Sequence, residues 1–337
     1  MPDSDTFPVG LVLAFVIFYF VVYVLSMIGN CWVMVTCYKT LKRKGSSLMW
    51  FVLNLATADL IFTFLSIFNG IGFLYRWVGG EIGCKFHGFL VETCYSVSIS
   101  TLIVISHERL TAITDPLNAR ARNFANKGYR KLLIVWGVCL MGCIPLTILY
   151  RMDRDANGKL VCNNTKLGDI GRQIFYCLHA FFFFIFPLSY MIFSQSKIFL
   201  ALRSRKIVPL QQDAERSNRR QRKIAKTLFA LTAALVICWS PFVIIRTLIY
   251  FCIAEPAALW RMFQLLICLN AVLDPIMYGI YGGNFKATLR QRCCFRFPRE
   301  RLERSVSLEM SQTAVTCAVQ PNAMKKQSCE GEEMNLS

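Results

Sequence analysis

The sequence predicts an all-α membrane protein, a bundle of seven transmembrane helices, and two observations carry that prediction. Hydrophobic residues make up 55% of the 337 residues and charged residues only 17%, against about 25% charged in an ordinary soluble protein. The apolar residues also fall into long blocks, whereas a helix on the surface of a soluble protein has an apolar stripe. A disordered chain, a coiled coil and a collagen-like fibre are excluded by this composition.

Seven blocks are long enough to cross a membrane, which takes roughly 20 mostly apolar residues. They are Val9–Tyr38, Leu48–Tyr75, Phe86–Ser106, Leu132–Leu149, Gln173–Phe193, Thr227–Ile253 and Leu259–Tyr281. The fourth block is the shortest, and alone it could equally form a buried helix. The first block lacks the basic start of a cleavable signal peptide, and it is longer than the apolar stretch of such a peptide. We therefore expect it to stay as the first span.

Basic residues set the orientation of these spans. The formal net charge of +18 is of the kind often found in nucleic-acid-binding proteins, but 29 of the 38 Lys and Arg residues lie after spans one, three and five and in the tail. Lys and Arg concentrate in cytoplasmic loops, so the N-terminus lies outside and no nucleic-acid partner is expected. Residues 1–8 then form a short extracellular segment, 9–281 the membrane domain, and 298–337 a polar, disordered cytoplasmic tail.

Four of the 15 cysteines and one asparagine are candidates for covalent chemistry. Cys84 and Cys162 both face the oxidising side, where disulfides persist. Bonded, they would clip the long outer loop onto a helix end; otherwise they are two free thiols. Cys293 and Cys294 lie inside, next to a basic run, which is typical of palmitoylated cysteines, although an unmodified pair fits as well. The outer triplet from Asn163 to Thr165 is an acceptor for N-glycosylation at Asn163.

Polar residues deep in the spans form a second group, because each costs a few kcal/mol unless it is satisfied. Oxygen ligands suit a hard cation, so this group could enclose a small hydrated ion. It could instead be only a hydrogen-bond network between helices. The residues are Asn30, Asp59, Glu92, Ser98, Asn270 and Asp274. All of them except Glu92 are candidate ligands of the ion.

Short motifs on the successive spans resemble those of the rhodopsin-like G-protein-coupled receptors, from about Gly29 to Cys294. The motifs are Gly29-Asn30, Leu55-Ala56-Thr57-Ala58-Asp59, Cys84, Glu108-Arg109, Trp136, Pro187, Cys238-Trp239-Ser240-Pro241 and Asn270-Ala271-Val272-Leu273-Asp274-Pro275-Ile276-Met277-Tyr278. Each motif alone is weak, but their order and their places on the spans are specific. The resemblance implies the seven-helix receptor fold with a short amphipathic eighth helix, which together with the lipidation cysteines would occupy residues 282–297.

The resemblance also implies roles for single residues. Arg109, with the adjacent Glu108 as its partner, would meet the G protein when the helices open, and Tyr278 would swing inward. Asp59, Ser98, Asn270 and Asp274 would match the family's allosteric sodium site, and no other cofactor is implied. The ligand pocket would include Val91, Tyr95, Trp239, Phe242, Arg246 and Gln264. The implied partners are an extracellular ligand, a heterotrimeric G protein, arrestin, receptor kinases and membrane lipid.

The sequence departs from the family pattern at three places near the inner side. Leu110 and Gln195 each stand where the family usually has Tyr, and the stretch Ser217–Thr227 contains no Asp or Glu. The family's carboxylate lock between that stretch and the arginine of helix three therefore has no counterpart on helix six.

The ligand class follows from the outer half of the chain. A retinal Schiff base needs a lysine in span seven, which has none, and Val91 stands where amine receptors carry aspartate. Glu92 follows Val91, but one residue turns a helix by about 100°, so we expect Glu92 to face elsewhere. The outer loop centres on Asn157-Gly158, the strongest short hairpin signal. A hairpin with both charges resembles the peptide-receptor branch, although it could be solvated and have no ligand role.

The sequence therefore predicts a plasma-membrane receptor that binds an extracellular ligand, a neuropeptide in the first place, and promotes nucleotide exchange on a G protein. A non-peptide small molecule or a lipid is the alternative ligand. A rival from another class is an ion transporter with Asp59, Asp274 and Glu92 as relay, although transporters often show paired repeats and the two halves show none. An inactive receptor relative is a third reading. No catalytic residue is expected.

Overall fold

The computed structural model describes residues 7–43, 47–115, 128–154, 158–204, 212–253 and 257–281. All of them belong to one compact unit, Met1–Lys286. The predicted amphipathic helix with Cys293 and Cys294, and the predicted tail, lie outside the described residues.

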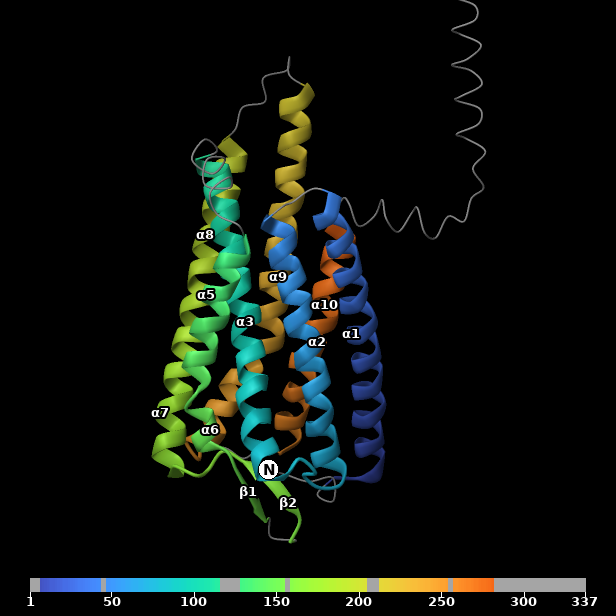
Figure 1. The fold of residues 1–337 in the computed structure, drawn as a ribbon, viewed down its shortest axis with the longest axis vertical. Coiled ribbons are helices and arrows are strands. Elements are labelled where there is room, and N and C mark those ends of the chain that lie inside the picture. The colour runs from blue at the N-terminus through green and yellow to red at the C-terminus, as the bar shows by residue number, and fades with distance from the viewer. Residues whose placement is uncertain are drawn as a thin grey trace, which may run out of the picture. The chain divides into compact units, whose positions relative to one another are not determined.

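The described residues form the seven-helix bundle that the sequence predicts (Figure 1). Seven helical segments are long and apolar enough to cross a membrane, so the protein is a multi-pass membrane protein. The helices are α1 (Val9–Arg43), α2 (Ser47–Leu74), α3 (Gly80–Thr114), α5 (Gly128–Cys143), α6 (Leu146–Leu149), α7 (Gly168–Ala180), η2 (Phe181–Ile185), α8 (Phe186–Ser204), α9 (Gln212–Tyr250) and α10 (Ala257–Tyr281).

Two spans are built from more than one helical segment. The fourth consists of α5 and α6, which Pro145 separates, because proline has no N–H to continue the backbone ladder. The fifth consists of α7, the π-helical η2 and α8, in which Pro187 is the second residue. Pro241 and Pro275 lie inside the continuous helices α9 and α10.

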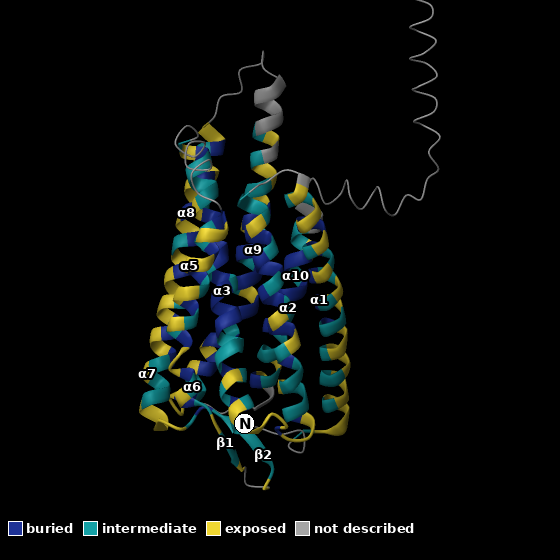
Figure 2. Ribbon diagram, viewed as in Figure 1, coloured by how far each residue is buried: buried dark blue, intermediate teal, exposed yellow. Residues whose placement is uncertain are grey.

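Side-chain hydrogen bonds between helices fix the register of the bundle. The Trp136 Nε1–H of α5 donates to Asn54 Oδ1 of α2 at 2.8 Å, and Asn54 Nδ2 donates to Thr101 Oγ1 of α3 at 2.9 Å. Three helices therefore meet at one buried amide. Large apolar side chains cover the outside of the bundle, and buried residues gather along its axis (Figure 2), as expected for helices that face lipid.

The outer loop is the hairpin that the sequence predicts. Strands β1 (Arg151–Arg154) and β2 (Leu160–Asn163) pair antiparallel, with Met152 opposite Cys162. Gly158 just before β2 has φ +77°, a conformation that glycine adopts without steric cost.

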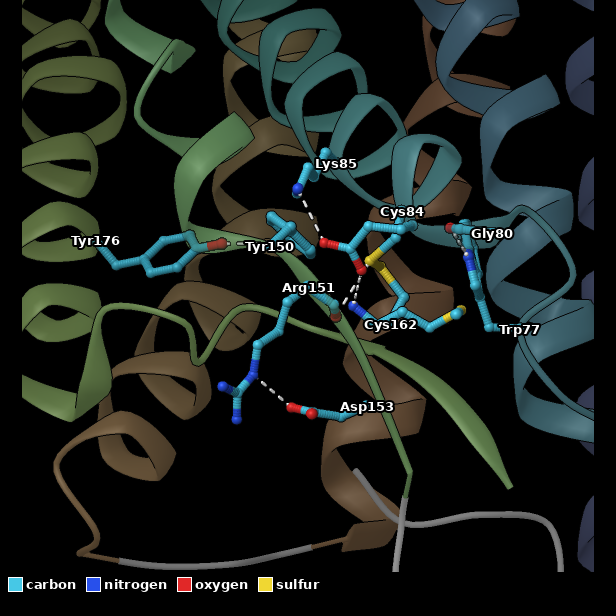
Figure 3. Close-up of a disulfide and its surroundings, with 11 residues drawn as sticks. Trp77, Gly80, Cys84, Lys85, Tyr150, Arg151, Asp153, Cys162 and Tyr176 are labelled. Carbon is cyan, nitrogen blue, oxygen red and sulfur yellow. Dashed lines mark hydrogen bonds and ion pairs between the residues drawn. A yellow bond between two sulfur atoms is a disulfide. The ribbon is translucent and has the colours of Figure 1, made fainter. Parts of the chain in front are cut away.

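Three contacts hold this hairpin against α3 and the loop before it; Figure 3 shows the disulfide and its surroundings. The predicted disulfide Cys84–Cys162 is formed. The Met152 N–H donates to Glu81 Oε2 at 2.8 Å, and the Trp77 N–H donates to the Leu160 carbonyl at 2.8 Å. Both strands are thus fixed over the outer end of the bundle. The disulfide between Cys84 and Cys162 is confirmed, and the alternative of two free thiols is wrong.

Removing the Cys84–Cys162 disulfide should loosen the β1–β2 hairpin. Cys84→Ala and Cys162→Ala should each lower the stability of the purified receptor and its surface expression, with the double variant no worse than either single one. Loss of a native disulfide typically costs about 2–5 kcal/mol in small secreted domains. Cys177→Ala is the matched control, because Cys177 is a free, exposed cysteine. Thermal melting and surface labelling measure the effect, and alkylation of both Cys84 and Cys162 in the intact, unreduced receptor would contradict it.

Candidate functional site

The outer half of the bundle contains a cavity of about 460 Å³ beneath the hairpin. Its wall is mostly apolar and aromatic, with a few polar groups, which is typical of ligand sites. The six residues that the sequence analysis assigned to a ligand pocket all line it: Val91, Tyr95, Trp239, Phe242, Arg246 and Gln264. Strand β2 contributes Val161, Cys162 and Asn163 to the same wall. Asn163 is half-buried there, and its glycosylation stays a prediction.

A buried ion pair is the main polar feature of this cavity. Arg246 Nη1 of α9 donates to Glu92 Oε1 of α3 at 2.7 Å, and the two side chains are only 3% and 12% exposed. The expectation that Glu92 faces away is therefore wrong. Val91 and Glu92 both line the cavity, because it wraps around more of α3 than the 100° that separates them.

His179 of α7 stands next to this ion pair, and the sequence analysis missed it. The Ser96 hydroxyl donates to the Glu92 carbonyl at 2.8 Å, so its oxygen is left to accept from His179 Nε2–H at 3.1 Å. His179 Nδ1 then turns toward Glu92 Oε2, 3.8 Å away. The signal was present in the sequence, since an ionisable residue within a span marks a functional site by default.

The hairpin is tied to the ion pair by a chain of polar contacts. Asn164, directly after β2, donates from Nδ2 to the hydroxyls of Tyr176 at 3.0 Å and Tyr250 at 2.8 Å. The Arg246 guanidinium lies over the Tyr176 ring, 4.6 Å from its centroid. A displacement of the hairpin would therefore move Tyr176, whose ring lies against Arg246.

The floor of the cavity is an aromatic layer that also roofs a second, smaller cavity. Tyr95 and Trp239 stack with their ring centroids 4.0 Å apart. Together with Phe62 and Ile267 they line both the outer cavity and a space of about 20 Å³ below it. A change in the position of these side chains therefore alters the walls of both cavities.

The smaller cavity collects the residues that the sequence assigned to sodium: Asp59, Ser98, Asn270 and Asp274. Ser98 Oγ donates to Asp59 Oδ1 at 3.2 Å. Asp59 Oδ2, Asn270 Oδ1 and both carboxylate oxygens of Asp274 are buried without a hydrogen-bond partner. Four unpartnered oxygens around a space of this size fit one hard cation, although the described residues contain no cluster of three or more His, Cys, Asp or Glu.

Asn30 does not belong to this ion group. Its Nδ2 donates to the Ala271 carbonyl of α10 at 2.8 Å and to the Ser26 carbonyl at 3.0 Å, and it does not line the small cavity. Here the alternative reading, a hydrogen-bond network between helices, is the correct one.

The inner end of α3 carries the residues assigned to G-protein coupling. The Glu108 carboxylate accepts a hydrogen bond from Lys131 of α5, so Glu108 has a cation partner on another helix, which the sequence did not indicate. Gln195, in place of the usual Tyr, donates from Nε2 to Thr232 Oγ1 at 2.5 Å and to the Leu228 carbonyl at 3.2 Å. This amide ties α8 to α9. The Tyr278 hydroxyl on α10 is buried without a hydrogen-bond partner.

The fold and these sites define a seven-helix membrane receptor. The model of the family "7 transmembrane receptor (rhodopsin family)" matches residues 29–278. The chain therefore belongs to this family of G-protein-coupled receptors, a class of non-enzymatic, multi-pass proteins of the plasma membrane, which sets aside the transporter reading.

Three relatives illustrate the range of similarity. Neuromedin-U receptor 2 of Homo sapiens is 26% identical over 293 residues, which cover 81% of this chain and 69% of the relative. Somatostatin receptor type 1 of Rattus norvegicus is 24% identical over 291 residues, covering 86% and 73%. A Gq-coupled rhodopsin of Mizuhopecten yessoensis is 27% identical over 321 residues, covering 88% and 63%.

The buried ion pair predicts a specific pattern of stabilities. Glu92→Gln should strongly destabilise the receptor, because it leaves the Arg246 guanidinium buried with its charge uncompensated, at a cost of about 3–5 kcal/mol. The double variant Glu92→Leu/Arg246→Met should recover most of this loss, since apolar replacements of a buried pair are often neutral. Thermal melting of purified protein measures the effect.

The matched control is Glu81→Gln, which breaks the Glu81–Lys85 pair on an exposed part of α3. It should cost far less than Glu92→Gln, because exposed ion pairs contribute little to stability, apart from any weakening of the Met152 contact. Equal losses for Glu92→Gln and Glu81→Gln would show that Arg246 is solvated after all.

Proposed function

We propose that the extracellular ligand of this receptor is a peptide and that one of its charged or polar groups reaches the Glu92–Arg246 pair. The observation that carries the proposal is a buried ion pair in a mostly apolar cavity. Beneath a hairpin with charges of both signs, such a site suits an extended ligand that offers polar groups along its length and one at its end.

The relatives support this assignment by their names. Two of them are called receptors for neuromedin-U and for somatostatin. The third is a rhodopsin, but α10 of this chain contains no lysine that could hold a retinal Schiff base. The peptide assignment therefore extends to this chain what two of the relatives bind.

Ligand binding would act by shifting a conformational equilibrium, which requires a difference in affinity between two states. A ligand group that competes for Glu92 or Arg246 breaks an interhelical ion pair between α3 and α9. Tyr95 and Trp239 form the floor of the same cavity. They transmit the movement of α3 and α9 to the inner part of the bundle. The inner ends of α3 and α9 then separate, and Arg109 and Tyr278 meet the G protein.

A screen of peptide pools against the full-length receptor, read as nucleotide exchange on co-expressed G proteins, tests the ligand class. Active peptides should lose most of their potency on Arg246→Ala, because truncating a buried charged partner costs about 2–5 kcal/mol. Arg76→Ala is the matched control, since Arg76 is exposed and does not line the cavity. The potency of the active peptides on Arg76→Ala should equal their potency on the wild-type receptor.

Two results would overturn the peptide assignment. One is a response to lipid or small-molecule pools with none to peptides. The other is a set of active peptides whose potency is equally unaffected by Arg246→Ala and Arg76→Ala, at matched surface expression.

We also propose that the small inner cavity binds a sodium ion through Asp59, Ser98, Asn270 and Asp274. Two facing carboxylates repel each other unless a cation or a proton lies between them. An ion held there requires the helices α2, α3 and α10 to stay close, and so favours the closed, inactive arrangement. The unpartnered oxygens of Asp59, Asn270 and Asp274 support this assignment.

The sodium site is testable without a ligand. Because binding to the folded state alone stabilises a protein in proportion to ln(1 + [L]/Kd), the melting temperature of the wild-type receptor should be higher in NaCl than in choline chloride at equal ionic strength. Asp59→Asn should remove this difference. Asn30→Ala is the control: it should lower the melting temperature but keep the sodium dependence. A wild-type melting temperature that is the same in both salts would contradict the site.

We further propose that arrestin and receptor kinases act on the tail, whose Ser305, Ser307, Ser311 and Thr313 lie outside the described residues. Agonist-dependent phosphorylation of these residues, read by mass spectrometry, tests this, and an unchanged phosphorylation state would contradict it.

A further inference from the structure

One end of the outer cavity has no role in the ligand site described above. We define the α1 lobe as the part lined by Val16, Tyr19, Phe20 and Tyr23 of α1, Gly72 of α2, and Leu265 and Cys268 of α10. None of these residues is charged. The Tyr19 hydroxyl already donates to the Ser66 carbonyl of α2, which leaves the Tyr23 hydroxyl as the main polar group among these side chains. The other side chains are apolar, so the lobe suits a mainly apolar guest.

The outer end of the lobe is covered by side chains. The rings of Phe7, Phe15 and Phe73 contact one another with centroids 6.1 to 6.4 Å apart. The Arg261 guanidinium lies over the Phe73 ring, 4.4 Å from its centroid. A guest that approached the lobe directly from the outer surface, and not through the rest of the cavity, would have to displace this aromatic cluster and its cation.

The side of the lobe toward the membrane is much thinner. Phe20 lines the cavity and is also 65% exposed, next to Ile17 and Val21, which belong to the lipid-facing surface of α1. Only 11% of the most hydropathic window of α1 is buried in the bundle, against 56% for α2. At this depth a membrane contains acyl chains and no water, so they are the molecules that meet Phe20 from outside.

We propose that the α1 lobe binds the acyl chain of a membrane phospholipid, which enters past Phe20 between α1 and α10. The driving force is the shape of the lobe together with dispersion contacts, since acyl chains leave no water when they enter. The lobe is lined from α1, α2 and α10, whereas the Glu92–Arg246 pair joins α3 and α9, so a lipid in the lobe leaves the pair free for a ligand.

Glycine residues give a matched pair of variants for the test. A Cβ at Gly72 would meet no heavy atom within 4 Å, and Gly72 faces the lobe. A Cβ at Gly137 of α5 also meets none, but Gly137 lies on the exposed face beside Leu133 and Ile134. Leucine has a higher helix propensity than glycine, and Gly72 lies in the last turn of α2 while Gly137 lies inside α5. Gly72→Leu fills the lobe and Gly137→Leu does not.

The experiment uses full-length receptor in nanodiscs of phosphatidylcholine that contain a small fraction of phosphatidylcholine with a photoreactive acyl chain. After irradiation, labelled residues are located by mass spectrometry. Phe20 can be labelled from either side, so the inward residues Tyr19 and Cys268 are diagnostic. We expect them to be labelled in the wild type and in Gly137→Leu, and the label to be lost in Gly72→Leu. Phe20→Ala should increase it. Labelling of Leu133 and Ile134 is the internal standard.

Two outcomes would overturn the proposal. One is an unlabelled Tyr19 and Cys268 in the wild type while Leu133 and Ile134 are labelled. The other is equal inward labelling in Gly72→Leu and Gly137→Leu. If lipid labelling is absent but Gly72→Leu alone abolishes the response to a water-soluble peptide agonist, the guest is an apolar side chain of the ligand. The peptide assignment would then survive while the lipid assignment fails.

Discussion

A polar group inside the hydrocarbon of a membrane has no water to bind, so the protein itself must satisfy it. The arrangement of the helices depends on this constraint. Asn54 joins α2, α3 and α5 through Trp136 and Thr101, and Asn30 joins α1 to α10. Where Asn30 makes its contact, Gly29 is needed, because a Cβ there would lie 3.0 Å from Pro275. Apolar packing alone would allow the helices to slide, whereas each buried amide is satisfied in one register only.

The same constraint explains why the functional groups form two separate sites. Glu92 and Arg246 neutralise each other in the outer cavity, and Asp59 and Asp274 face each other in the inner one, where no basic side chain lines the wall. The first site is balanced without a guest, while the second brings two carboxyl groups together without a basic partner in its wall. Since Phe62, Tyr95, Trp239 and Ile267 line both cavities, a ligand that moves this layer changes the space available to a cation below. Linkage requires the reverse effect to be equal in free energy.

The sequence predicted the parts of the fold that follow from hydropathy, charge and local motifs. It predicted the seven spans, the hairpin and the disulfide. Helix ends were predicted less well: α3 extends from Gly80 to Thr114, beyond the predicted Phe86–Ser106, because hydropathy reports the thickness of the hydrocarbon, and helices continue into the headgroup region. The pairing of Glu92 with Arg246 and of Glu108 with Lys131 joins residues from different helices. Such pairs depend on how each helix is rotated about its axis, which the order of motifs along one chain does not determine.

The first helix shows how packing and open space alternate along one element. At Gly29 the absence of a side chain brings α1 against Pro275, and three residues earlier Ser26 Oγ lies 2.7 Å from Thr63 Oγ1 of α2. Further out, aromatic side chains replace these small residues. Tyr19 contacts α2 through its hydroxyl, and its ring lies over Gly70 of α2, while the rings of Tyr19 and Phe20 also line the cavity. Small residues deep in the span anchor α1 to its neighbours, and bulky ones nearer the outside hold it at a distance that leaves the lobe open. The inner polar contacts of α1 therefore fix its position against α2 and α10, while its outer part forms one wall of the cavity.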